Sequence, residues 1–202
     1  MKALPAKASF VDANTVHVTY SNGQGFRDVN AETIVIAVGT SASVGDHGQS
    51  DNGCIFTSDQ ILSLDALPRT LSVNGGGVIG CEYATIFAAL GVRVTLIDAR
   101  DRLLPFVDAE IMDALVYEMR QNRITLRLGQ AVSAVEPFVD DRGPKVRLRL
   151  ESGKQIVSEK ALYSIGRTGA TQGLALKAAG LEADNRGRVD VNEHYQTAVP
   201  NI

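Results

Sequence analysis

Three glycines near the middle of the chain have the spacing of a dinucleotide-binding loop, G-x-G-x-x-G. The pattern covers Gly75, Gly76, Gly77, Val78, Ile79 and Gly80. In such a loop the first glycine permits a tight turn, the second lets the backbone approach a pyrophosphate, and the third lets a helix pack on a strand. Because the chain contains 19 glycines, the pattern carries weight only where a strand precedes it and a helix follows it.

An acidic residue follows these glycines at the distance expected of a ribose ligand. Asp98 lies 18 positions after Gly80, at the predicted end of the next strand. A carboxylate there can accept hydrogen bonds from both hydroxyls of the adenosine ribose of NAD. The alternative is a solvated aspartate at a strand end. The dinucleotide interpretation is favoured, because the glycines, the helix that follows them and the acid all have the spacing of a dinucleotide-binding unit.

Two arginines come directly after this acid. Arg100 or Arg102 could bind the 2′-phosphate of NADP, since a nearby arginine accommodates that group in related loops. They could instead form an ordinary surface pair with Asp101, and the sequence by itself favours that interpretation. Asp98 therefore indicates NAD, while the two arginines leave NADP open.

Glu82 is also close to the glycine loop. It lies two residues after Gly80, in the predicted first turn of the helix. It either complements the positive end of the helix dipole, or it faces the nicotinamide or a lysine beside a second cofactor. The spacing leaves these alternatives open.

The sequence assigns no catalytic residue and no metal ligand. His17, His47 and His194 are scattered and have no partner at the spacing of a metal site or a catalytic triad. Cys54 and Cys81 lie 27 positions apart and form no C-x-x-C pair, so zinc and thioredoxin-type redox chemistry have no support. Two thiols in such a chain are typical of a reducing compartment, and we expect the cytoplasm.

The elements around the glycine loop alternate between strand and helix. A short strand over 71–73 leads into the loop, a helix follows with apolar residues at helical spacing up to Gly91, and a strand covers 92–97. This β-α-β unit is the context that the glycine pattern requires.

Beyond this unit the chain predicts another helix and more strands. The helix covers about 108–122 and a strand covers 124–128. Strand-like runs near 130–137, 144–151 and 154–159 are separated by turn residues and predict an antiparallel meander. A last apolar strand covers 161–165.

The first 65 residues are predicted to be rich in strands. Residues 15–20 alternate between apolar and polar side chains, as in a half-buried strand. The continuous apolar run 34–38 is typical of a strand that is covered on both faces.

The composition excludes several classes of protein. Of 202 residues, 45% are apolar and 21% are charged, so disorder, collagen and coiled coil are disfavoured. The formal net charge is −3 and no basic face is evident, which argues against nucleic acid and membrane as partners. The N-terminal residues lack the apolar core of a secretory signal, and no apolar stretch is long enough to span a bilayer.

Residues 73–84 resemble the NAD(P)-binding segment of the two-dinucleotide flavoprotein reductases, the pyridine nucleotide-disulfide oxidoreductase family. This family includes dihydrolipoyl dehydrogenase and glutathione reductase. Further stretches are similar to a narrower group of the family, whose members exchange hydride between nicotinamide nucleotides. These stretches are 57–62, 100–104, 166–169 and 195–200.

The resemblance implies an α/β fold. Residues 66–165 would form a Rossmann-like NAD(P)-binding domain, with a parallel sheet and an antiparallel three-stranded meander. Residues 1–65 would be the C-terminal part of the first segment of a homologous FAD-binding domain, and 166–202 the start of its second segment. The resemblance also implies that the chain is an internal fragment, inactive by itself, of a longer protein that forms a homodimer.

The family assigns binding roles to residues outside the glycine loop. By resemblance, Val38, Gly39 and Thr40 pass close to FAD, Val132 contacts the adenine end of the nucleotide, and Gly166 lies beside its nicotinamide half. The implied cofactors are FAD, NAD and NADP.

The implied activity is hydride transfer from NADPH to NAD through FAD, as in an NAD(P) transhydrogenase of the Si-specific type. One alternative is dihydrolipoyl dehydrogenase or a related disulfide reductase, whose redox-active cysteine pair would lie upstream of residue 1. A second alternative is a non-catalytic fragment that only binds nucleotide.

Overall fold

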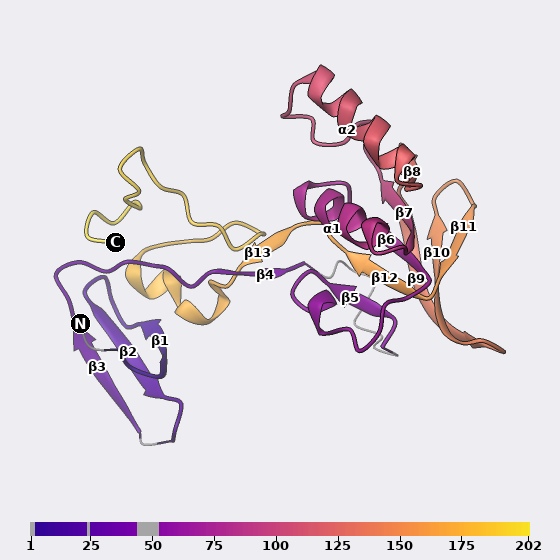
Figure 1. Ribbon diagram of the computed structural model, residues 1–202. Coiled ribbons are helices and arrows are strands. Elements are labelled where there is room, and N and C mark those ends of the chain that lie inside the picture. Colours follow the sequence, from indigo (N-terminus) through magenta and orange to yellow (C-terminus); the bar gives the residue numbers. More distant parts are fainter. Residues whose placement is uncertain (1–2, 24, 44–52) are drawn as a thin grey trace. The chain divides into compact units, whose positions relative to one another are not determined.

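The computed structural model describes residues 3–23, 25–43 and 53–202, and its chain forms two compact units (Figure 1). The first unit joins Met1–Ser41 to Arg167–Ile202, and the second is Ala42–Gly166. His47 lies outside the described residues. None of the helices among the described residues combines the length and the apolar character that a membrane span requires. The assignment of 1–65 and 166–202 to an FAD-binding domain stays a prediction.

The second unit is built on a parallel sheet of five strands. Its order is β5-β12-β6-β7-β8, with every neighbouring pair parallel. The strands are β5 (Ile55–Thr57), β6 (Thr70–Asn74), β7 (Arg93–Asp98), β8 (Thr125–Leu128) and β12 (Lys160–Tyr163). The predicted strand–helix alternation is therefore confirmed, since parallel neighbours need crossover connections.

Two helices supply the crossovers from β6 to β7 and from β7 to β8, and they begin differently. Helix α2 (Ala109–Gln121) starts with an aspartate cap, because the Asp108 side chain accepts a hydrogen bond from the Glu110 amide at 2.9 Å. Helix α1 (Val78–Ala89) starts at Gly77, and no side chain caps it. The first amides of α1 therefore lack a side-chain acceptor.

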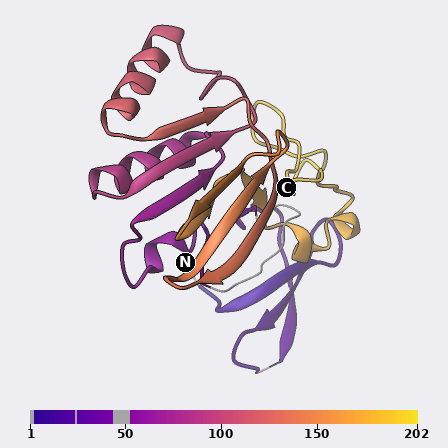
Figure 2. The same ribbon diagram turned by 90° about the vertical axis from the view of Figure 1, so that its right-hand side faces the viewer.

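Different elements cover the two faces of this sheet. On one face Leu71, Val73 and Leu96 pack with apolar residues of α1 and α2, such as Phe87 and Met119. The other face packs against an antiparallel sheet ordered β11-β10-β9 (Figure 2). Its strands are β9 (Val132–Asp140), β10 (Gly143–Leu150) and β11 (Gln155–Ser158), which confirms the predicted meander.

The first unit contains an antiparallel sheet of β1 (Ala6–Phe10), β2 (Thr15–Tyr20) and β3 (Phe26–Asn30). Further along the chain, β4 (Thr40–Ala42) pairs with β13 (Arg167–Gly169). Short 3-10 helices are η1 (Ile61–Ser63) in the second unit, and η2 (Gln172–Leu174) and η3 (Leu176–Ala179) in the first. Phe10, Leu176 and Ile202 are buried together in a core of the first unit.

The prediction of a doubly covered strand over 34–38 is wrong for this structure. These residues form no strand, and Val35 is 82% exposed. Ile34 donates its amide to the Asn201 carbonyl at 2.9 Å. Ile34 and Ile36 pack against the core of the first unit, whereas Val35 and Ala37 are exposed, so only one face of the run is covered. Among the described residues no strand pairs with it to satisfy its backbone.

Candidate functional site

The glycine loop connects β6 to α1 and places each glycine for a different physical reason. Gly75 has a φ of +109°, and a Cβ there would lie 2.5 Å from the Ser164 carbonyl oxygen. A Cβ on Gly80 would lie 1.8 Å from the Gly75 carbonyl oxygen, which is why helix and loop can pack so closely. A Cβ on Gly77 would meet nothing within 4 Å, so this glycine faces open space. That space is where a pyrophosphate would approach the backbone.

Gly76 contributes more than its place in the pattern suggested. Its amide donates to Asp98 Oδ2 at 2.5 Å. A Cβ on Gly76 would lie 2.3 Å from Cδ2 of Leu103 and 3.0 Å from the same carboxylate oxygen. The loop is thereby held against the end of the neighbouring strand β7.

The Asp98 carboxylate is buried, with a residue exposure of 6%, and it accepts four hydrogen bonds. Besides the Gly76 amide, its donors all belong to Arg100. The Arg100 amide and Nε each lie 2.8 Å from Oδ1, and Nη2 lies 2.7 Å from Oδ2. A carboxylate offers about four acceptor positions, so all of them are used.

These contacts decide the protonation state of Asp98. Burial alone raises its pKa, but the hydrogen bonds from Arg100 and Gly76 outweigh burial and hold the pKa below its usual range. The same pairing raises the pKa of Arg100. Both groups are therefore charged at neutral pH.

The two arginines after Asp98 have different environments. Arg100 pairs with Asp98, so the expected surface pair with Asp101 is wrong for Arg100. Arg102 is exposed, and within the described part of the chain no ion pair is recorded for it. Arg102 is therefore the arginine whose guanidinium is available to a new anion.

Glu82 does not lie where the sequence predicted. It is exposed and is the fifth residue of α1, whose first turn contains no acidic residue. A carboxylate beyond the first turn interacts weakly with the helix dipole, because that effect falls off within one turn. The dipole interpretation of Glu82 is therefore wrong, and a contact with the nucleotide stays a prediction.

The loops that follow four parallel strands meet at one edge of the sheet. The Ser164 hydroxyl, after β12, donates to the Gly75 carbonyl at 2.8 Å. After β8, the Gln130 amide donates to the Asp98 carbonyl at 3.0 Å. In an open α/β sheet, ligands bind outside the carboxyl ends of the strands. No local sequence signal marked Ser164, which lies 89 positions from Gly75.

Two residues assigned by resemblance lie on segments of this edge. Val132 is the first residue of β9 and is half-buried, two positions after Gln130. Gly166 has a φ of +136°, and its carbonyl accepts the Ser43 amide at 3.0 Å. Their contacts with nucleotide stay predictions.

Cys81 lies in α1 just behind the loop. Its thiol is buried and donates to the Gly76 carbonyl at 3.6 Å. Burial, together with the charge of Asp98, raises the pKa of this thiol to about 11. Cys81 is therefore a thiol at neutral pH, with little of the thiolate that redox chemistry needs.

The residues expected near FAD belong to the first unit. Gly39 has a φ of +71°, and its carbonyl accepts the Ala170 amide at 3.0 Å. Arg167 donates from Nη2 to the Thr40 carbonyl at 2.8 Å. Within this unit, residues 33–40, Val38 among them, line a groove of about 730 Å³ together with residues of 167–202.

Comparisons with known proteins define the class of this chain. A family model described as pyridine nucleotide-disulphide oxidoreductase matches residues 2–202. The chain belongs to this family, and the resemblance and fold class expected from the sequence are confirmed.

Particular relatives carry a more specific name. The chain is 43% identical, over 195 residues, to the soluble pyridine nucleotide transhydrogenases of Yersinia enterocolitica and Yersinia pestis. The match covers 96% of this chain and 41% of each relative, so the chain spans about two fifths of their length.

Solved structures of the family have the same fold. The flavoprotein disulfide reductase RclA from Escherichia coli matches with a TM-score of 0.83 at 27% identity, over 96% of this chain and 43% of that protein. LpdA from Mycobacterium tuberculosis matches with a TM-score of 0.84 at 25% identity, over 95% and 42% of the two chains.

Proposed function

We propose that the full-length protein containing this chain transfers hydride from NADPH to NAD through FAD. The observation that carries the proposal is the 43% identity to soluble pyridine nucleotide transhydrogenases over 96% of the chain. The glycine loop agrees with it, because Gly77 faces open space. A disulfide reductase is the second candidate, because RclA is named as one, but its identity is lower at 27%.

The glycine loop is the proposed site of the dinucleotide. The fit is supported by the open space at Gly77 and by the absence of a side-chain cap on α1, whose first amides point where a phosphate needs donors. Gly75 and Gly80 keep the backbone tight, and Asp98 holds Gly76 in place. The nicotinamide half would extend toward Gly166, and the adenine end toward Val132.

The charges at the end of β7 are proposed to serve both nucleotides. The 2′-phosphate of NADPH would bind the exposed Arg102, and Arg100 if it turns away from Asp98. The ribose diol of NADH would bind Asp98 after the same movement of Arg100. One pocket that takes NADPH and NAD in turn predicts ping-pong kinetics.

FAD supplies the redox centre that accepts and returns a hydride when it is bound. Val38, Gly39 and Thr40 are proposed to lie against it, and the groove of about 730 Å³ along residues 33–40 supports that placement. The role of the protein residues is to orient the two partners and to hold their phosphates. Si-specific transfer and a homodimer of the full-length protein are part of this proposal. A cytoplasmic location is also proposed, because two cysteines 27 positions apart in a chain of 202 residues are typical of a reducing compartment.

The proposal is tested on the full reading frame. The purified protein is mixed with NADPH and an NAD analogue whose reduced form absorbs at its own wavelength. Reduction of the analogue supports the transhydrogenase. Parallel lines in double-reciprocal plots support the ping-pong mechanism, whereas intersecting lines would indicate a sequential one. Reduction of lipoamide or glutathione disulfide without exchange between nucleotides would establish a disulfide reductase instead.

A further inference from the structure

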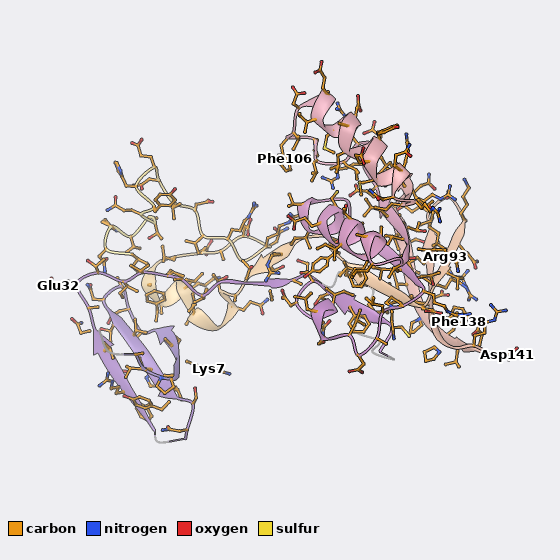
Figure 3. The ribbon with its side chains drawn as sticks, in the orientation of Figure 1. Lys7, Glu32, Arg93, Phe106, Phe138 and Asp141 are labelled. Atoms are coloured by element: carbon orange, nitrogen blue, oxygen red, sulfur yellow. The ribbon has the colours of Figure 1, made fainter. Side chains whose placement is uncertain are left out.

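A second pocket lies at the opposite edge of the parallel sheet, where the strands begin. It has a volume of about 180 Å³. Its charged lining residues come from the starts of β6 and β7 and from the meander. They are Arg69, Arg93, Arg142, Lys145 and Glu159. In the view of Figure 3, Arg93 lies on the same side of the second unit as Asp141 of the β9–β10 turn.

An ion pair between Arg69 and Glu159 forms part of the lining of this pocket. Arg69 donates from its amide and from Nε to the Glu159 carboxylate, both at 2.7 Å. The Glu159 amide donates to the Thr70 hydroxyl at 2.9 Å. The hydrogen bond from the Arg69 amide is the main reason that the pKa of Glu159 lies below its usual value, so Glu159 is ionised. The positive charge of Arg69 is therefore balanced by the Glu159 carboxylate.

A second cation of the pocket also has a partner. Lys145 forms an ion pair with Asp140, and only 15% of its side chain is exposed. In contrast, neither Arg93 nor Arg142 forms an ion pair within 4 Å among the residues that the structure describes, and the charge of Arg142 acts on Asp140 only at longer range. Four cations and two carboxylates, Glu159 and Asp140, leave two positive charges.

We propose that this pocket binds a small dianion, either inorganic phosphate or the phosphate group of a phosphomonoester. The remaining charge of +2 is equal and opposite to the charge of a phosphate dianion. The guanidinium groups of Arg93 and Arg142, which have no ion-pair partner within 4 Å among the described residues, provide the planar pairs of donors that phosphate oxygens accept. Since a water occupies about 30 Å³, a pocket of 180 Å³ accommodates a tetrahedral oxyanion with some hydration. Pockets for drug-sized ligands span about 300–1,000 Å³, so a whole dinucleotide does not fit.

This site is separate from the glycine loop. Thr70 begins β6 and Gly75 follows its end, and five residues of strand at about 3.3 Å each separate the two by roughly 17 Å. The phosphate site and the dinucleotide site can therefore be tested independently.

The experiment titrates inorganic phosphate into the 202-residue chain by calorimetry at neutral pH and constant ionic strength. We expect saturable binding, weakened about tenfold in Arg93→Gln and in Arg142→Gln, because a hydrogen bond to a charged group is lost. The control is Lys154→Gln, which removes the same charge from the turn between β10 and β11, outside the pocket. It should bind as the wild type does.

Several results would overturn the site. They are no binding by the wild type, full binding by both arginine variants, or equal weakening by Lys154→Gln. If Arg93→Gln lowers the melting temperature without phosphate, Arg142→Gln in the exposed turn carries the test alone.

Two further arms define the ligand and the location. A repeat with glycerol phosphate identifies which source of phosphate binds more tightly, and either order supports the site. A repeat with Gly77→Val should leave phosphate binding unchanged. Loss of binding in that variant would place the phosphate at the glycine loop and overturn the proposal.

Discussion

Nη2 of Arg100 lies 2.7 Å from Oδ2 of Asp98, and the same oxygen accepts the amide of Gly76. One carboxylate therefore holds both the glycine loop and one of the two arginines proposed for the 2′-phosphate. An acid in this position was expected to be free for the ribose diol. Because the acceptor positions of Asp98 are all used, an NADH ribose at the proposed site would have to displace Arg100 before it could bind this carboxylate.

Removing the Asp98 carboxylate should weaken NADH binding about tenfold or more. The Asp98→Ala variant loses a charged acceptor and leaves the buried Gly76 amide without a partner. NADPH should lose less affinity, because the released Arg100 gains a phosphate partner. Calorimetric dissociation constants for both nucleotides at one ionic strength measure the difference. Asp98→Asn, which keeps an acceptor for Gly76, is the matched control for loop stability. Equal losses for NADH and NADPH would refute the ribose-reading role.

Substitution of Arg100 and of Arg102 should have different effects on nucleotide affinity and on the melting temperature. Arg102→Ala should weaken NADPH about tenfold, spare NADH and leave the melting temperature unchanged, since this exposed side chain has no recorded ion pair among the described residues. Arg100→Ala should lower the melting temperature, because it removes both guanidinium donors from the buried Asp98 carboxylate and leaves only the backbone amides of Gly76 and residue 100. Fluorescence titration and thermal unfolding measure the two effects. If Arg102→Ala leaves NADPH affinity intact, Arg100 is the residue that reaches the phosphate.

Asp98 should also make stability depend on pH in the acid range. Its pKa is lower in the folded chain than the value of about 3.9 in an unfolded one. The ionised carboxylate therefore stabilises the folded state above that value, and the contribution is lost as the pH falls through the lower folded pKa. Urea unfolding of the wild type and Asp98→Asn between neutral and acid pH should show the two free energies converging. A constant difference at every pH would contradict this linkage.

Substitutions at Gly77 and at Gly80 should have different consequences, the first for nucleotide binding and the second for the stability of the fold. Gly77→Val should abolish nucleotide binding without loss of fold, because its side chain would fill the open space needed by the pyrophosphate. Gly80→Ala should unfold or strongly destabilise the second unit, by about 2 kcal/mol or more, because its Cβ would lie 1.8 Å from the Gly75 carbonyl. Circular dichroism and nucleotide titration of both variants distinguish the two effects. Normal nucleotide affinity in Gly77→Val would mean that the glycine serves only the turn.

The isolated chain should bind NADH or NADPH weakly and retain little FAD. Its glycine loop is whole, whereas the flavin contacts proposed on this chain are limited to Val38, Gly39 and Thr40. The purified chain should therefore be colourless at the flavin absorption bands, and nucleotide fluorescence should change on titration. A stoichiometric yellow complex would show that these residues suffice for flavin.

Local sequence patterns determined the elements of the second unit. The strand before Gly75, the helix after Gly77 and the helix over about 108–122 could be predicted, because periodicity and glycine geometry act within a few residues. The meander was readable for the same reason, since turn residues separate its strands. The apolar run 34–38 was misread, because the neighbours that make a run into a strand are not part of the run.

The tertiary structure decided how the charges are used. Sequence spacing placed Asp98 at a strand end, but only packing brought its carboxylate to the Gly76 amide, 22 positions away. Ser164 reaches Gly75 across 89 positions, and Arg69 meets Glu159 across 90. A charged side chain has several rotatable bonds, and its partner is chosen by which strands lie side by side. The sequence predicts where the strands begin and end, whereas the order of the strands in the sheet decides which of their terminal residues meet.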